Sequence, residues 1–194
     1  MNREPDARKA KYGVFLVDNH PIVRHGLTQL INREPDLMVC GESEDESEAL
    51  TAVAAAKPDV VMVGLILKRS SGFSLIKNLN ALDPKLSILV LTIHDESLYA
   101  ERCLRAGAKG YLMKEEAMEN VLLAIRRVLA GQVYLSEEMQ EKLFRSSGDV
   151  TSLFRAACDV SLGPEERTQN ERQTVYDRRE DSHPAGGGRG QIDP

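Results

Sequence analysis

Five short apolar runs, each followed by a segment of helical periodicity, constrain the fold of this chain more than any other feature. The runs are continuous, as in strands that are buried on both faces of a sheet. The segments between them repeat apolar residues every three or four positions, as an amphipathic helix does. Alternation of this kind favours an α/β fold with a doubly wound, five-stranded parallel sheet. The runs are Val14–Val17, Met38–Cys40, Val60–Leu65, Ile88–Leu91 and Tyr111–Met113.

Four residues stand at the carboxyl ends of these predicted strands, namely Asp18, Gly64, Thr92 and Lys114. In a doubly wound sheet the functional crevice lies outside the carboxyl ends, where the strand order reverses. Each residue also has a simpler explanation. Asp18 could cap the helix that begins near Pro21, Thr92 could merely end a strand, and Lys114 could be a solvated lysine. Their combination favours a shared site.

Several segments, occurring in the right order, are similar to a known family. On them, residues 13–136 resemble the receiver domain of two-component response regulators, most closely those of the NarL/FixJ (LuxR-type) branch. This resemblance implies a flavodoxin-like fold with strand order 2-1-3-4-5. No single segment decides the matter, but the ordered set is specific for the fold. The segments are Val14–Arg24, Pro58–Val61, Leu89–Thr92, Ala106–Lys114 and Gly131–Ser136.

The resemblance implies a role for most residues at the strand ends. In this family two adjacent acidic residues hold Mg²⁺, and they correspond here to Asp18 and Asn19. A threonine or serine that contacts the phosphoryl oxygens corresponds to Thr92, and a lysine that pairs with the phosphoryl group corresponds to Lys114. An aromatic residue that changes rotamer with the switch corresponds to Tyr111, for which simple packing is an equal alternative.

The position that accepts the phosphoryl group in this family is Gly64 here. An acyl phosphate needs a carboxylate nucleophile, and glycine has none. Because Asn19 is neutral, we expect Mg²⁺ to bind only weakly at Asp18 and Asn19, and Asp18 to pair directly with Lys114. Asp59 is no substitute acceptor, because it stands upstream on the same strand, roughly 16 Å from the pocket.

The loop after Gly64 departs from the family a second time. Lys68 and Arg69 stand where a proline usually follows, although Gly72 is retained. The two departures suggest either that the pocket chemistry no longer matters or that the loop has another role. A solvated loop is the simpler interpretation of the two basic residues.

The pattern divides the chain into four parts. We predict a flexible arm over residues 1–12, the receiver domain over 13–131, a short linker helix over 132–146 and a poorly ordered tail over 147–194. From Pro164 onward the chain is almost entirely polar, with too little apolar surface to offset the entropy of ordering. Full-length NarL/FixJ regulators carry a helix-turn-helix domain, whose apolar pattern the tail lacks. A truncated or frame-shifted coding sequence is one explanation.

Composition sets further limits. The net charge of −5 over 194 residues gives no general attraction to nucleic acid or to anionic membranes. The three cysteines are widely spaced, as expected for reduced thiols, and the histidines lack the spacing of metal ligands. The charged start lacks the apolar core of a signal peptide, and no run is long enough for a membrane span. We therefore expect a cytoplasmic protein.

We expect a signalling module and not an enzyme. It would be a degenerate receiver that is not phosphorylated at the usual site and that contacts a protein partner around its fourth and fifth helices. The partner would be a histidine kinase or another regulator, and the edge of the apolar stripe on residues 117–130 could also form a homodimer.

Two other functions are alternatives. A DNA-binding transcriptional regulator of the NarL/FixJ type needs a basic recognition element, but the arginines of the tail alternate with acidic residues. An enzyme acting on a small molecule or phosphate is the weakest alternative. No glycine-rich phosphate loop follows the first run, and no nucleophile–base pair stands out.

Overall fold

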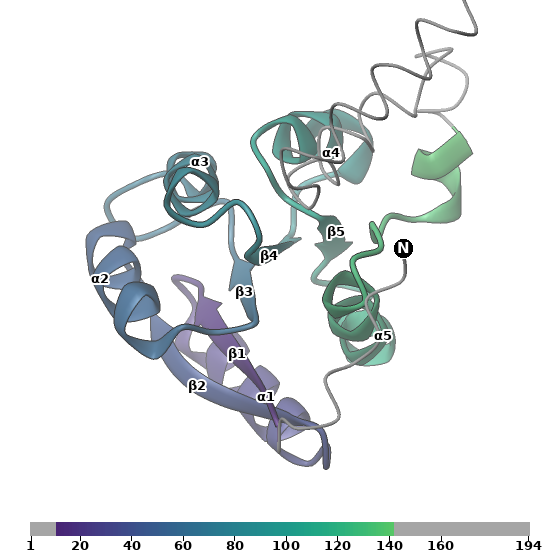
Figure 1. Cartoon of the computed structure of the whole chain (residues 1–194). Coiled ribbons are helices and arrows are strands. Elements are labelled where there is room, and N and C mark those ends of the chain that lie inside the picture. The colour runs from purple at the N-terminus through teal and green to yellow at the C-terminus, as the bar shows by residue number, and fades with distance from the viewer. Residues whose placement is uncertain (1–10, 142–194) are drawn as a thin grey trace, which may run out of the picture. The chain divides into compact units, whose positions relative to one another are not determined.

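The computed structural model describes residues 11–141 (Figure 1). Five strands alternate with five helices along this part of the chain, as the sequence pattern predicts. The strands are β1 (Tyr12–Val17), β2 (Leu37–Ser43), β3 (Val60–Val63), β4 (Ser87–Thr92) and β5 (Gly110–Met113). The helices are α1 (Pro21–Asn32), α2 (Glu46–Ala56), α3 (Gly72–Leu82), α4 (Glu96–Arg105) and α5 (Ala117–Leu129).

All strand pairs are parallel, and the strand order is β2-β1-β3-β4-β5. This confirms the predicted doubly wound sheet and its order. From β1 the chain runs outward to β2 and then returns to β3 on the other side of β1. The strand order therefore reverses between β1 and β3, which is where a crevice is expected in such a fold.

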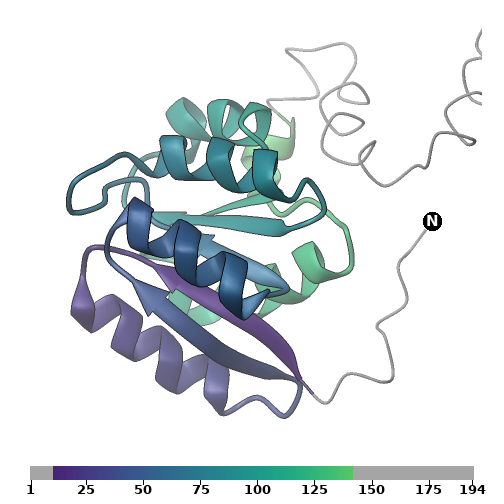
Figure 2. The ribbon, with the colours of Figure 1, turned by 60° about the vertical axis from the view of Figure 1, so that its left-hand side comes forward.

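The helices form two layers, with α1 and α5 on one face of the sheet and α2, α3 and α4 on the other (Figures 1 and 2). Successive side chains of a strand point to opposite faces. In β1, Val14 and Leu16 pack with the α1 and α5 layer, whereas Phe15 and Val17 pack with the other layer. Because both faces are covered, the strands read as unbroken apolar runs.

Local signals set the starts of the helices close to the carboxyl ends of the strands. Pro21 opens α1, where its missing N–H costs nothing. The side chains of Asp45, Ser71 and Asp95 accept a hydrogen bond from the backbone N–H two residues further on, at the starts of α2, α3 and α4. These caps hold the loops at the carboxyl edge of the sheet.

After α5 the chain turns at Gly131, whose φ of 78° lies in the left-handed region that favours glycine. Within the predicted linker helix, 132–146, the chain is non-helical up to Ser136 and helical from Glu137 to Glu141. The rest of that range, the tail over 147–194 and nearly all of the arm over 1–12 lie outside the described residues. The predicted domain boundaries therefore stay predictions.

Residues 132–141, which we call the strap, pack on the domain. Tyr134 forms a parallel bridge with Gly110 of β5, and Leu135 and Met139 are buried in the same apolar cluster as Cys103 of α4. Between residues 11 and 141 no helix has both the length and the apolar character that crossing a bilayer requires.

Candidate functional site

The carboxyl ends of four strands bring the predicted site residues to one edge of the sheet. Asp18 and Gly64 directly follow β1 and β3, and the Gly64 N–H donates to the Val17 carbonyl at 2.8 Å. Thr92 ends β4, and its carbonyl accepts from the Lys114 N–H at 2.8 Å. Backbone hydrogen bonds thus join neighbouring strand ends in pairs.

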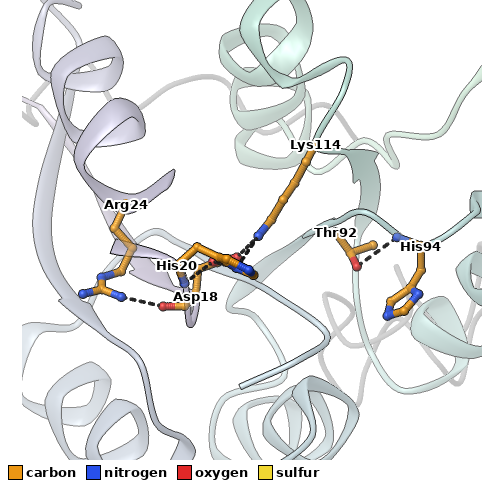
Figure 3. Close-up of polar contacts among 6 residues, drawn as sticks. All are labelled: Asp18, His20, Arg24, Thr92, His94 and Lys114. Atoms are coloured by element: carbon orange, nitrogen blue, oxygen red, sulfur yellow. Dashed lines mark hydrogen bonds and ion pairs between the residues drawn. The ribbon is translucent and has the colours of Figure 1, made fainter. Parts of the chain in front are cut away.

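Asp18 and Lys114 form the predicted ion pair. Lys114 Nζ lies 2.5 Å from Asp18 Oδ2, and the two side chains are only 14% and 5% exposed (Figure 3). Asp18 Oδ2 is buried, and the Lys114 ammonium is the cation that balances its charge. Because the pair is largely shielded from water, its attraction is less screened than that of a surface pair.

The Asp18 carboxylate lies against the place where a side chain at position 64 would begin. A Cβ atom built on Gly64 would be 2.7 Å from Asp18 Oδ2, closer than real Cβ contacts. The same oxygen faces Lys114. The space at position 64 is therefore bordered directly by Asp18, and a larger residue there would have to displace its carboxylate.

His20 completes the surroundings of Asp18. Its backbone N–H donates to Asp18 Oδ1 at 2.8 Å, and its Nδ1 lies 3.0 Å from that oxygen and 3.3 Å from Lys114 Nζ. With Nδ1 protonated, the ring donates to Asp18; with Nδ1 bare, it accepts from Lys114. Either tautomer keeps the imidazole over the ion pair (Figure 3).

Arg24 fixes the turn that carries Asp18. Its Nη1 donates to the Asp18 carbonyl at 2.7 Å, and its Nε faces Glu42 at 3.6 Å. Sequence reasoning did not single out Arg24 or His20. Both lie in the segment Val14–Arg24 that carried the resemblance, which is the one signal that could have pointed to them.

Thr92 and Tyr111 meet at His94 and not at the ion pair. The Thr92 hydroxyl accepts from the His94 N–H at 3.3 Å (Figure 3), and the Tyr111 hydroxyl donates to the His94 carbonyl at 2.9 Å. Burial raises the pKa of the Tyr111 phenol, which keeps it a hydrogen-bond donor. Among the described residues, no hydrogen bond or ion pair joins the side chains of Thr92 or Asn19 to Asp18 or Lys114.

The loop after β3 is tied to the loop after β2 through Lys68. Its backbone N–H donates to the Glu44 carbonyl at 3.1 Å, and its ammonium pairs with the Glu44 carboxylate. A proline at this position could not donate the backbone bond.

Asp59 lies at the amino end of β3, opposite the pocket. Its carboxylate accepts a hydrogen bond from the Gly13 N–H at 2.8 Å, so it does not approach the pocket.

The donor set does not fit a tight Mg²⁺ site. Mg²⁺ is usually held by one or two carboxylates together with waters and phosphate oxygens. Here the Lys114 ammonium already lies against Asp18 Oδ2, and Asn19 offers only a neutral amide oxygen. Within residues 11–141 no group of three or more His, Cys, Asp or Glu is placed to hold a metal ion. A cation would have to displace the ammonium to reach this carboxylate.

The sequence profile of the response regulator receiver domain matches residues 14–126, more than half of the chain. The chain belongs to the response regulator receiver family. Among curated relatives it is 35% identical over 148 residues to the uncharacterized transcriptional regulatory protein YxjL of Bacillus subtilis, covering 76% of this chain and 65% of YxjL. It is 33% identical over 131 residues to the oxygen regulatory protein NreC of Staphylococcus haemolyticus, covering 67% of this chain and 60% of NreC.

Solved structures agree with this assignment. A LuxR-family two-component response regulator from Aurantimonas sp. is 31% identical, with a TM-score of 0.66 over 72% of this chain and 99% of that structure. RcsB from Salmonella enterica, solved bound to a promoter with the phosphomimetic BeF3-, is 25% identical, with a TM-score of 0.63 over 72% of this chain and 70% of RcsB. These likenesses confirm the NarL/LuxR type of receiver.

The receiver spans less than two thirds of the length of the curated relatives described above. The shared part is the receiver itself, because the matching profile covers residues 14–126. Proteins of this family are signalling proteins of two-component systems, and that assignment holds for this chain at the level of the receiver domain.

Proposed function

We propose that this protein is an atypical receiver that is not phosphorylated at the usual position and that signals through contact with other proteins. One observation carries the proposal. Gly64 supplies no nucleophile, and the Asp18 carboxylate, 2.7 Å from where a Cβ would be, borders the space directly. An acyl phosphate forms on a side-chain carboxylate. Because glycine has none, residue 64 cannot carry this modification.

Without a phosphoryl group, contacts within the chain must set the conformational balance. A ligand shifts a two-state protein only through different interactions in its two states. Here Asp18 holds the lysine that would otherwise pair with the phosphoryl group, and Tyr111 is buried with its hydroxyl on the β4–α4 loop. We infer that this receiver rests in one state, fixed by its sequence and adjusted by a partner.

The contact surface that we propose lies around α4 and α5. Leu98 of α4 and Leu123 of α5 are 73% and 47% exposed, so both helices offer apolar side chains outside the core. The partner would be a histidine kinase, another regulator or a second copy of this chain. The free thiol of Cys103 is consistent with a reducing compartment and so with the expected cytoplasmic location.

The test is exposure of the whole chain to acetyl phosphate, and separately to beryllofluoride, each with Mg²⁺. We expect no mass increase of one phosphoryl group and no change in melting temperature. A family member that keeps the acceptor aspartate serves as the positive control. A stoichiometric adduct, or a marked stabilisation by beryllofluoride, would defeat the proposal.

A second candidate function is DNA-binding regulation of transcription. It is favoured by the relatives whose names describe transcriptional regulators, such as YxjL. It requires a basic element that enters a groove, and the net charge of −5 counts against non-specific attraction. Binding to duplex DNA and its salt dependence decide between the two candidates.

A further inference from the structure

The strap covers the open edge of the sheet. β5 is the last strand in the order β2-β1-β3-β4-β5, so its outer edge would carry unpaired backbone groups. The Tyr134 N–H donates to the Lys109 carbonyl at 3.0 Å, and the Tyr111 N–H donates to the Tyr134 carbonyl at 2.9 Å. One residue of the strap therefore makes both backbone hydrogen bonds to this edge.

Few side chains hold the strap down. Tyr134, Leu135 and Met139 are 8%, 3% and 4% exposed, and the last two pack in the cluster that contains Ala100 and Cys103 of α4. Val133 is partly buried against the same cluster, and the bridge at Tyr134 is the one strand-like pairing of the strap. Because a single bridge joins its backbone to the sheet, this attachment opens more easily than the strand ladders of the core.

A polar contact joins the strap to α4. The Ser136 N–H donates to Glu96 Oε1 at 3.0 Å, and the Ser136 hydroxyl donates to Glu96 Oε2. The same hydroxyl accepts from the Met139 N–H at 3.1 Å and so caps the short helix of the strap. Glu96 is only 9% exposed, and a buried carboxylate without donors is costly. The two donors of Ser136 make this closed position specific.

A hinge precedes the strap. Gly131 has a φ of 78°, and a Cβ placed on it would meet no atom within 4 Å. Its backbone conformation suits glycine and few other residues. The Gly131 N–H donates to the Val128 carbonyl at 3.1 Å and the Gln132 N–H donates to the Arg127 carbonyl at 2.9 Å, so the chain leaves α5 at this turn.

We propose that the strap is a releasable cover of α4 and β5, hinged at Gly131 and latched by the two hydrogen bonds from Ser136 to Glu96. Tyr111 connects this cover to the pocket, because its N–H donates to Tyr134 and its hydroxyl donates to His94. His94 also contacts the Thr92 hydroxyl. Tyr111 therefore contacts both the strap and the β4–α4 loop. A movement of the strap would reach this loop through Tyr111 without any phosphorylation at position 64.

Cys103 provides a built-in probe of release. It is fully buried on the face of α4 that the strap helps to cover, and burial raises the pKa of its thiol to about 12, so it reacts slowly while the strap is closed. The experiment measures maleimide labelling of the Cys103 peptide in the whole chain by mass spectrometry. Amide exchange at Tyr111 and Tyr134 is followed in parallel, with Val61 in central β3 as the reporter of global unfolding.

Ser136→Ala and Glu96→Ala are the test variants. Loss of a hydrogen bond to a charged group should raise Cys103 labelling and exchange at Tyr111 and Tyr134 by about tenfold, with Val61 unchanged. Ser74→Ala is the matched control, because the Ser74 hydroxyl donates to the Glu46 carboxylate at 2.7 Å, away from the strap. It should leave all readouts unchanged.

Two outcomes would overturn the proposal. In the first, labelling and exchange in both test variants equal those of the control, which means that Ser136 and Glu96 do not hold the strap. In the second, exchange at Val61 rises together with that at Tyr111 and Tyr134, which means that the strap opens only when the whole domain unfolds.

Discussion

At the scale of single residues, Asp18 and Lys114 hold one negative and one positive charge in contact at the carboxyl edge of the sheet. The sequence predicted this pair because both residues follow strands that end at the same edge. It did not predict the position of His20 over the pair, since the contacts of an imidazole depend on side-chain rotamers that no local pattern encodes.

Removal of the Lys114 charge alone should lower the free energy of unfolding more than removal of the Asp18 and Lys114 charges together. Lys114→Met leaves the Asp18 carboxylate buried without a charge partner, and we expect it to lower the free energy of unfolding by about 2–4 kcal/mol. Lys114→Met combined with Asp18→Asn should cost less than this single change. Urea denaturation of the variants checks the order, and a double variant that is the least stable of the set would contradict it.

Gly64→Ala tests whether Asp18 occupies the edge of the vacant space. The new Cβ would lie 2.7 Å from Asp18 Oδ2, so we expect a loss of about 1 kcal/mol of stability. In an Asp18→Ala background the same substitution should be neutral or stabilising, since the clash is gone. Gly26→Ala is the control, because a Cβ there meets nothing within 4 Å and alanine favours the helix by about 0.8 kcal/mol. Equal effects of Gly64→Ala in both backgrounds would argue against the close contact.

At the scale of elements, the apolar runs and helical segments predicted all five strands and five helices, with small shifts at their ends. The third strand, for example, ends at Val63 and not at Leu65. The strap could not be predicted in this way. Its bridge to β5 and its contact with Glu96 join residues far apart in sequence, and the local pattern predicts only a short linker helix over 132–146.

The stability of the folded chain should depend on pH through Glu96. Burial raises the pKa of the Glu96 carboxyl above its ordinary value of 4.5, although the hydrogen bonds from Ser136 act in the opposite direction. The folded chain therefore holds this proton more tightly than the unfolded chain. The resulting stabilisation is fully present below pH 4.5 and is lost as the pH rises through the folded pKa.

We accordingly expect the wild-type free energy of unfolding to fall relative to that of Glu96→Gln as the pH is raised from about 4.5 towards neutrality. Chemical denaturation of both proteins over this range measures the difference. A difference that stays constant with pH would show that Glu96 does not titrate in this manner.

The start of α4 gives a further test. The Asp95 side chain accepts from the Ser97 N–H at 2.7 Å, so Asp95→Ala should lower stability by about 1 kcal/mol through loss of the cap. Asp95→Asn should retain most of it, because asparagine caps equally well. Thermal unfolding distinguishes them, and an equal loss in both variants would show that the charge of Asp95, not its cap, matters.

At the scale of the whole molecule, the family and the parallel sheet followed from an ordered set of segments, but the partner did not. Contacts with another protein depend on exposed side chains such as Leu98 and Leu123, which no motif marks. The charge of the chain does permit a prediction about nucleic acid.

With a net charge of −5, the whole chain should show no measurable binding to non-specific duplex DNA even at low salt, since such binding rests on neutralised phosphates. Fluorescence anisotropy with a labelled duplex at about 50 mM salt provides the measurement. Saturable binding that weakens steeply as salt is added would favour the transcriptional alternative.

The crowding at Gly64 also bears on any attempt to place an acidic side chain in this pocket. An aspartate at position 64 would bring a second carboxylate beside that of Asp18, whose Oδ2 lies 2.7 Å from where the new Cβ would stand. The two carboxylates would then compete for the single ammonium of Lys114. Such a variant should therefore be less stable than the wild type unless a cation joins the pair, and neutral Asn19 is poorly suited to hold one.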